Sequence, residues 1–250
     1  MRTVSPETAE AIQAIILQEL PGWVEENPTL RRRLQEALRE ASTQTERDPT
    51  LPDPMTYEEF LDWADEDTLT EWVALPGREK GKVVMYSPAS EQHQRIAGFL
   101  ITVMGIFVEQ RDLGVVLGAP FQMKLERSGR EPDVIFVAQE HLDRLQETYL
   151  DGPADLVVEI VSPESIGRDR GEKFYEYAEG GVPEYWLLDP SRRWAEFYQL
   201  GKERRYEIAF IGREGVYHSE ALPGFWLRVE WLWQDPLPKT LDVLRELGVV

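Results

Sequence analysis

The chain has 250 residues, 42% hydrophobic and 29% charged, which is the composition of a globular protein able to bury a full-sized core. No stretch approaches the roughly 18 consecutive apolar residues of a membrane span. Cysteine is absent, which excludes disulfides and thiolate metal sites. The net charge of −19 argues against a surface that attracts nucleic acid everywhere, because phosphate contacts need a basic face. Since the N-terminus lacks the apolar segment of a signal peptide, we expect a cytoplasmic protein without membrane partners.

Residues 1–45 are predicted to form a separate helical hairpin. Ser5, followed by a proline, is a candidate N-cap for "SPETAEAIQAIILQEL", and Asn27, also followed by a proline, begins "NPTLRRRLQEALREAS". The break "PGW" separates the two helices. A polar, proline-rich stretch then predicts a linker over residues 46–55, which leaves residues 56–250 as the main domain.

The main domain alternates between helix and strand patterns. Thr56 and Glu59 have capping-box spacing at the start of a short helix, two strand-like stretches flank the turn "PGREKG", and residues 89–111 predict a long, largely buried helix. Further strands, rich in β-branched and aromatic residues, are predicted at 114–118, 121–126, 133–138, 155–161, 184–189, 194–200 and 204–211. A helix over 168–180 and an amphipathic C-terminal helix complete the order. This order predicts an α/β fold with a mixed sheet flanked by helices.

Two carboxylates interrupt segments that otherwise have the pattern of buried strands. Asp133 follows Pro132 at the mouth of "REPDVIFV", and Glu159 lies inside "DLVVEIVSP", where both faces of the strand are apolar. An isolated charge there is costly, so each carboxylate is expected to be paired, protonated or bound to a metal. On adjacent strands the two could converge on one cation, and hard oxygen ligands favour Mg²⁺ or Mn²⁺. The alternative is a structural ion pair, with Arg168 or Arg170 as partner.

Lys173 is the third candidate. It is the only lysine between Lys124 and Lys202, in a chain where arginine outnumbers lysine 21 to 6. An ammonium beside an acidic strand can position a water molecule or stabilise charge that develops on a phosphoryl group. Two metal-binding carboxylates and a lysine are sufficient for metal-assisted hydrolysis of a phosphodiester.

The motifs "PDVIFV", "DLVVEIVSPES" and "DRGEKFYEYAEGGVPEYWLLDP" resemble the Uma-type restriction endonuclease family, a branch of the PD-(D/E)xK nuclease superfamily, as does "VVMYSPASEQHQRI" upstream. The resemblance covers about residues 56–235. It implies a restriction-endonuclease-like core in which Asp133 and Glu159 hold a divalent cation, the backbone carbonyl of Ile160 helps to coordinate it, and Lys173 is catalytic.

The sequence departs from the superfamily pattern at one position. The lysine usually stands two residues after the acidic residue, where this chain has Val161, and Lys173 on the following helix is expected to replace it. Three further residues are auxiliary candidates at the site, and the alternative for each is a structural or exposed side chain. They are His93 and Glu91 near the start of the long helix, and Glu71 in the first strand.

Three functions remain open on this reading. The first is an endonuclease that uses Mg²⁺ or Mn²⁺ to hydrolyse DNA, for which cleavage of both strands by one site per chain would suggest a homodimer. The second is a non-catalytic interaction or regulatory protein that retains the nuclease fold, which the charge of −19 favours. The third is a metal hydrolase of a small phosphorylated substrate. The combination of Asp133, Glu159 and Lys173 favours the endonuclease.

Overall fold

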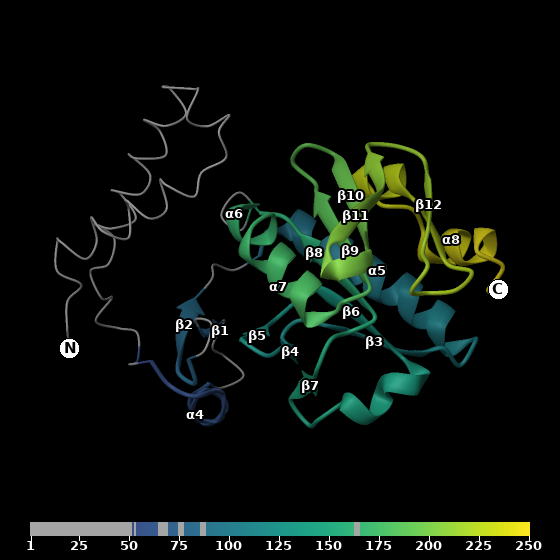
Figure 1. Cartoon of the computed structure of the whole chain (residues 1–250). Coiled ribbons are helices and arrows are strands. Elements are labelled where there is room, and N and C mark those ends of the chain that lie inside the picture. The colour runs from purple at the N-terminus through teal and green to yellow at the C-terminus, as the bar shows by residue number, and fades with distance from the viewer. Residues whose placement is uncertain (1–51, 53, 65–69, 75–77, 86–88, 163–165) are drawn as a thin grey trace, which may run out of the picture. The chain divides into compact units, whose positions relative to one another are not determined.

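The computed structural model describes residues 52, 54–64, 70–74, 78–85, 89–162 and 166–250 (Figure 1). The chain divides into two compact units, residues 1–52 and 53–250. All of the first unit except Pro52 lies outside the described residues. The hairpin over 1–45 and the linker over 46–55 therefore stay predictions.

A six-stranded mixed sheet forms the centre of the second unit, in the order β11-β10-β9-β8-β6-β3. Strands β8 and β9 are parallel, and every other neighbouring pair is antiparallel. The strand bounds are β3 Gly114–Gly118, β6 Val134–Ala138, β8 Leu156–Ile160, β9 Glu184–Asp189, β10 Trp194–Leu200 and β11 Tyr206–Gly212.

Both faces of this sheet are covered. One apolar cluster joins it to helices α5 (Glu91–Glu109) and α8 (Thr240–Glu246), and a second includes residues of α7 (Glu172–Gly180). All five residues of β8 are consequently buried. Burial on both faces explains why the sequence of this strand is apolar at nearly every position.

A second sheet has five strands in the order β2-β1-β5-β4-β7. Its strands are β1 Thr70–Ala74, β2 Gly81–Met85, β4 Gln122–Lys124, β5 Ser128–Arg130 and β7 Tyr149–Asp151. Helix α4 (Tyr57–Trp63) precedes it, and the predicted capping box between Thr56 and Glu59 is confirmed. Tyr57 and Phe60 of this helix pack with residues of β1 and β2 in a third apolar cluster.

The remaining elements are short. They are η1 Gln139–Arg144, α6 Ile166–Asp169, η2 Lys202–Arg204, β12 Val216–His218, β13 Trp226–Arg228 and η3 Val229–Trp233. Strands β12 and β13 form a two-stranded sheet. In the part of the chain that the structure describes, no helix combines the length and the apolar character needed to cross a membrane.

The mixed sheet flanked by helices confirms the predicted fold class. Three strands have the predicted bounds, at 114–118, 184–189 and 194–200. The single helix predicted over 168–180 is wrong, because the chain forms α6 and α7 with a break between them at Gly171 (φ −116°, ψ −97°). Strand β5 was not predicted, because "SGR" carries none of the β-branched or aromatic residues that mark a strand.

Candidate active site

Asp133 directly precedes β6, and Glu159 lies on β8, the strand that pairs with β6. Strands β6 and β8 pair with Val134 opposite Val158, so the next position along the ladder sets Asp133 opposite Glu159 on the same face. Oδ2 of Asp133 accepts a hydrogen bond of 2.6 Å from the backbone N–H of Ile160. This bond fixes the Asp133 carboxylate against the end of β8.

Lys173 reaches the same place from the first turn of α7. Its buried Nζ lies 3.0 Å from Oε1 of Glu159, 3.1 Å from Oε1 of Glu71 and 3.6 Å from Oδ1 of Asp169. The ammonium thus joins carboxylates from both large sheets. Glu71, an auxiliary candidate from the sequence, directly contacts the predicted lysine.

Arg130 on β5 holds Glu71 in place beside Lys173. Its side chain has 0% exposure and donates to Oε2 of Glu71 at 3.0 Å. It also donates two hydrogen bonds of 2.9 Å to Glu176 on α7. Arg130 therefore connects β1 to the helix that carries Lys173.

Tyr177 orients Glu159. Its hydroxyl donates a 2.6 Å hydrogen bond to Oε1 of Glu159, the same oxygen that accepts from Lys173. Both donors lie on α7, one turn apart, and both are buried. Two donors on Oε1 fix the rotation of the carboxylate and set the direction of Oε2.

The site holds more carboxylates than cations. Burial raises the pKa of Glu159 from its usual 4.5 to about 8, with Lys173 opposing the shift and Asp169, Asp133 and Glu71 adding to it. Ionisation of Glu159 is therefore unfavourable in the protein alone, even beside an ammonium. Such a carboxylate becomes easier to ionise when a further positive charge is supplied.

Lys173 and Glu71 remain charged. Burial alone lowers the pKa of Lys173, but the carboxylates of Glu159, Glu71 and Asp169 outweigh it and raise the pKa above its usual 10.5. Burial opposes ionisation of Glu71, yet Lys173 and Arg130 lower its pKa below 4.5 overall. Lys173 is thus a permanent cation at neutral pH.

The two auxiliary candidates on α5 are placed differently. Nε2 of His93 lies 3.1 Å from Oδ1 of Asp133. Burial alone lowers the pKa of His93, but Asp133, Asp169 and the backbone of Ile160 raise it above 6.5 overall. Glu91 points to solvent, 78% exposed and 3.4 Å from Arg95, so the structure does not bring it to the cluster.

The arginine pairs weighed as the alternative for the two acids are not seen in the described residues. Arg170 contacts Glu196 on β10, with distances of 2.5 and 2.7 Å to its two oxygens. The side chain of Arg168 lies outside the described residues. Asp133 and Glu159 are instead paired with His93 and Lys173.

The oxygen atoms of Asp133 and Glu159 are donors of the kind that hard divalent cations prefer. Among the described residues, no three acidic or histidine side chains stand ready as a complete metal site. Ligands beyond Asp133 and Glu159 would have to be backbone carbonyls, such as that of Ile160, and water. Mg²⁺ commonly binds in this way, through one or two carboxylates and several waters.

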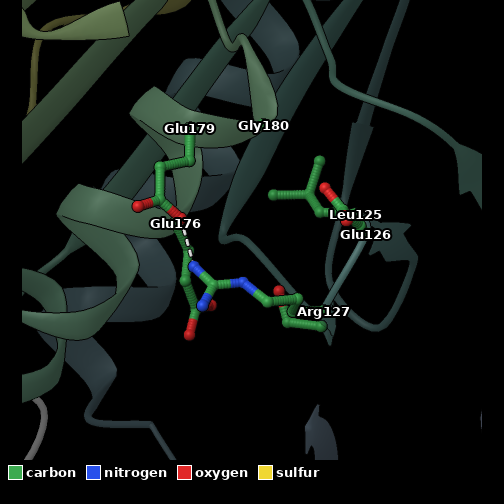
Figure 2. Close-up of a pocket in the computed structure, with 7 residues that line it drawn as sticks. Leu125, Glu126, Arg127, Glu176, Glu179 and Gly180 are labelled. Atoms are coloured by element: carbon green, nitrogen blue, oxygen red, sulfur yellow. Dashed lines mark hydrogen bonds and ion pairs between the residues drawn. The ribbon is translucent and has the colours of Figure 1, made fainter. Parts of the chain in front are cut away.

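A small hollow lies beside the cluster, between α7 and the β4–β5 turn. Figure 2 shows the Glu179 carboxylate directed at Arg127, with which it forms an ion pair. The volume of the hollow is about 30 Å³, which is space for one water molecule. It is too small to bind a nucleotide.

Three residues of the cluster, Asp169, Tyr177 and Arg130, were missed from the sequence. Asp169 and Tyr177 stand four residues before and four residues after Lys173, a helical spacing that could have indicated a shared face. Arg130 gave no usable signal, because its role depends on Glu71, which is 59 residues away in sequence.

A mixed sheet that presents an aspartate and a glutamate on adjacent strands, with a lysine on the next helix, has the architecture of a restriction-endonuclease-like protein. The Uma2 family, described as "Putative restriction endonuclease", matches residues 57–230, so the chain belongs to this family.

The structure also resembles a solved one. The crystal structure of a "putative nuclease belonging to DUF820" from Anabaena variabilis matches with a TM-score of 0.60 and 16% identity. The match covers 72% of this chain and 98% of that one, and at this identity it supports the fold alone. A comparison with curated proteins finds no match.

Replacing Glu159 should stabilise the metal-free protein at alkaline pH. The pKa of Glu159 is higher in the folded protein (about 8) than its usual 4.5. Its contribution to stability is therefore fully present below pH 4.5 and is lost as pH rises through 8. Glu159→Gln keeps the shape without the charge, and we expect it to raise the free energy of unfolding by about 1–3 kcal/mol at high pH. Urea denaturation with a chelator measures this, and a variant less stable than wild type at pH 9 would contradict it.

Removing Arg130 should destabilise the fold strongly. Arg130→Met removes the cation of the partly buried Glu176 and leaves the buried Glu71 with Lys173 alone, at a cost of about 3–5 kcal/mol. Arg127→Met is the matched control. Arg127 pairs with the exposed Glu179, which lies on α7 as Glu176 does, and such an exposed contact is worth about 1 kcal/mol or less. Equal midpoints in urea for the two variants would show that the buried network carries no stability.

Proposed function

We propose that this protein is an endonuclease that hydrolyses phosphodiester bonds of DNA with Mg²⁺ or Mn²⁺. The observation that carries the proposal is the cluster of the partly exposed Asp133 with the buried Glu159 and Lys173, in a chain of the Uma2 family. Asp133 and Glu159, with the carbonyl of Ile160, would hold the cation. When bound, the cation supplies Lewis-acid activation of water and charge stabilisation at the phosphoryl group.

Lys173 has an electrostatic role in this proposal. As an ammonium, it can donate hydrogen bonds to the attacking water or to a phosphoryl oxygen. Glu71 and Glu159 hold its ammonium at 3.1 and 3.0 Å, so little reorganisation is needed when charge develops. Tyr177 fixes Glu159, and Arg130 fixes Glu71, in support of that geometry.

The net charge of −19 supports a second candidate, a non-catalytic interaction protein that retains the nuclease fold. A nucleic acid would approach such a chain against its overall field. The cost of keeping Glu159 buried favours the enzyme, because a protein without catalysis gains nothing from a carboxylate that resists ionisation. A small phosphorylated substrate is a third candidate, and assays on both kinds of substrate separate the three.

Cleavage should require both the metal and Lys173. Plasmid, duplex and single-stranded DNA incubated with Mg²⁺ or Mn²⁺ should be cut by the wild type, and Asp133→Asn and Lys173→Met should lower kcat by about 10²-fold or more. The controls Asp143→Asn and Lys202→Met change exposed residues of the same types and should retain the wild-type rate. Cutting that persists in a chelator, or wild-type rates in Asp133→Asn, would contradict the mechanism.

Metal binding should stabilise the protein through Asp133. A cation at 100 times its Kd raises the free energy of unfolding by about 2.7 kcal/mol. Thermal unfolding with Mg²⁺ or Mn²⁺ should show this increase for wild type and for Asp143→Asn, but not for Asp133→Asn. The same shift in all three proteins would place the bound metal elsewhere.

A further inference from the structure

The charge of the chain is distributed unevenly. Residues 191–215 contain six basic and four acidic side chains, a local charge of +2 in a chain of −19. This segment includes β10 and β11. One of its acids, Glu196, is buried against Arg170. The exposed side chains of the hairpin therefore carry a more positive net charge than the +2 counted from the sequence.

The basic residues gather at the two ends of the hairpin. Arg192 and Arg193 lie in the β9–β10 turn, and Arg213 directly follows β11. The other three, Lys202, Arg204 and Arg205, lie in the β10–β11 turn at the opposite end. All six are exposed.

The first end is at the same edge of the sheet as the candidate active site. The ladder runs across the sheet from Glu159 to Leu187, from Leu187 to Glu196 and from Glu196 to Ile211. One position further along the strands, Ala195 pairs with Leu188 and with Gly212, which Arg213 follows, and two positions further Asp189 pairs with Trp194. Arg192, Arg193 and Arg213 therefore extend just past the row that contains Glu159.

The separation suits a polyanion. Strands lie about 4.8 Å apart, so one to two strands separate Arg192 and Arg193 from Glu159, and three strands separate Arg213 from it, which gives roughly 5–15 Å. Successive phosphates on one strand of a duplex are about 3.4 Å apart along the helix axis, so these distances correspond to roughly one to four nucleotides. A nucleic acid bound at the active site can reach all three arginines.

Two local features support a role of these arginines in binding a ligand. The Arg213 guanidinium lies 5.8 Å from the centre of the Trp194 ring, which limits its motion. Arg193 has a left-handed backbone (φ 49°), a conformation that glycine or asparagine adopts at lower cost than arginine. Glu214 is the exposed acid beside them, and the buried Asp189 lies 3.6 Å from Arg192.

We propose that Arg192, Arg193 and Arg213, the arginine edge, contact the phosphodiester backbone beside the bond that is cleaved. The proposal rests on the proposed nuclease function and names the surface that receives its substrate. It explains how an acidic protein can hold a polyanion at one edge of its sheet. Each arginine would neutralise a phosphate and release its counterions.

The test compares two sets of three substitutions that change the charge equally. Arg192→Gln, Arg193→Gln and Arg213→Gln remove the arginine edge, and Lys202→Gln, Arg204→Gln and Arg205→Gln remove the opposite end of the hairpin. Anisotropy of a fluorescent DNA duplex, in a chelator at about 50–200 mM salt, gives Kd and its salt dependence. Losing the edge should raise Kd roughly tenfold or more and make the log–log salt slope shallower by about 2–3, with the control within about twofold of wild type.

Equal weakening of DNA binding by both sets of substitutions, or by neither, would overturn the proposal. A result in which the arginine edge is needed for binding to anionic vesicles but not to DNA would also overturn it. A wild type that binds through the edge but never cleaves refutes the nuclease and leaves the surface standing. A wild type that cleaves DNA, with KM unchanged in the edge variant, refutes the binding surface alone.

The single substitution Arg193→Asn separates an effect on folding from an effect on binding. It should keep or raise Tm while it weakens DNA binding. Unchanged binding with a lower Tm would show that Arg193 is structural.

Discussion

The contact between Glu159 and Lys173 is the interaction on which the rest of the site depends. Glu159 is 3% exposed in a strand covered on both faces, where an unpaired carboxylate would be too costly to retain. Lys173 offsets that cost only in part, because the pKa of Glu159 still rises to about 8. The site is therefore poised between a protonated acid and an ionised one.

Holding one ammonium among several acids requires both large sheets. Asp133 and Glu159 come from the six-stranded sheet, whereas Glu71 and Arg130 come from the five-stranded sheet. Arg130 binds Glu176 on the helix that carries Lys173, so the position of the lysine depends on contacts that α7 makes with the second sheet. The geometry of the site is thus a property of the whole described domain.

Local patterns predicted what local chemistry determines. Strands β3, β9 and β10 have the predicted bounds, because their residues favour extended chain and turn residues flank them. The two acids stood out because a charge inside an apolar run is locally anomalous. Arg130 could not be found in this way, since a fully buried arginine in the short strand "SGR" is explained only by acids distant in sequence. The break between α6 and α7 was missed because the polar residues of "IGRDRGEKF" fit one continuous helix as well as two short ones.

Net charge is a poor guide to what one edge of this protein binds. Charges on an exposed surface are screened over about 8 Å at physiological salt, so acids on the far side of the domain contribute little to the field at the end of β8. Residues 191–215 carry a small positive excess in a chain of net charge −19. At the site itself the buried carboxylates favour a cation, and an added cation would in turn favour a phosphate. An acidic chain and an anionic substrate are therefore compatible, provided that the positive charge lies where the sheet ends.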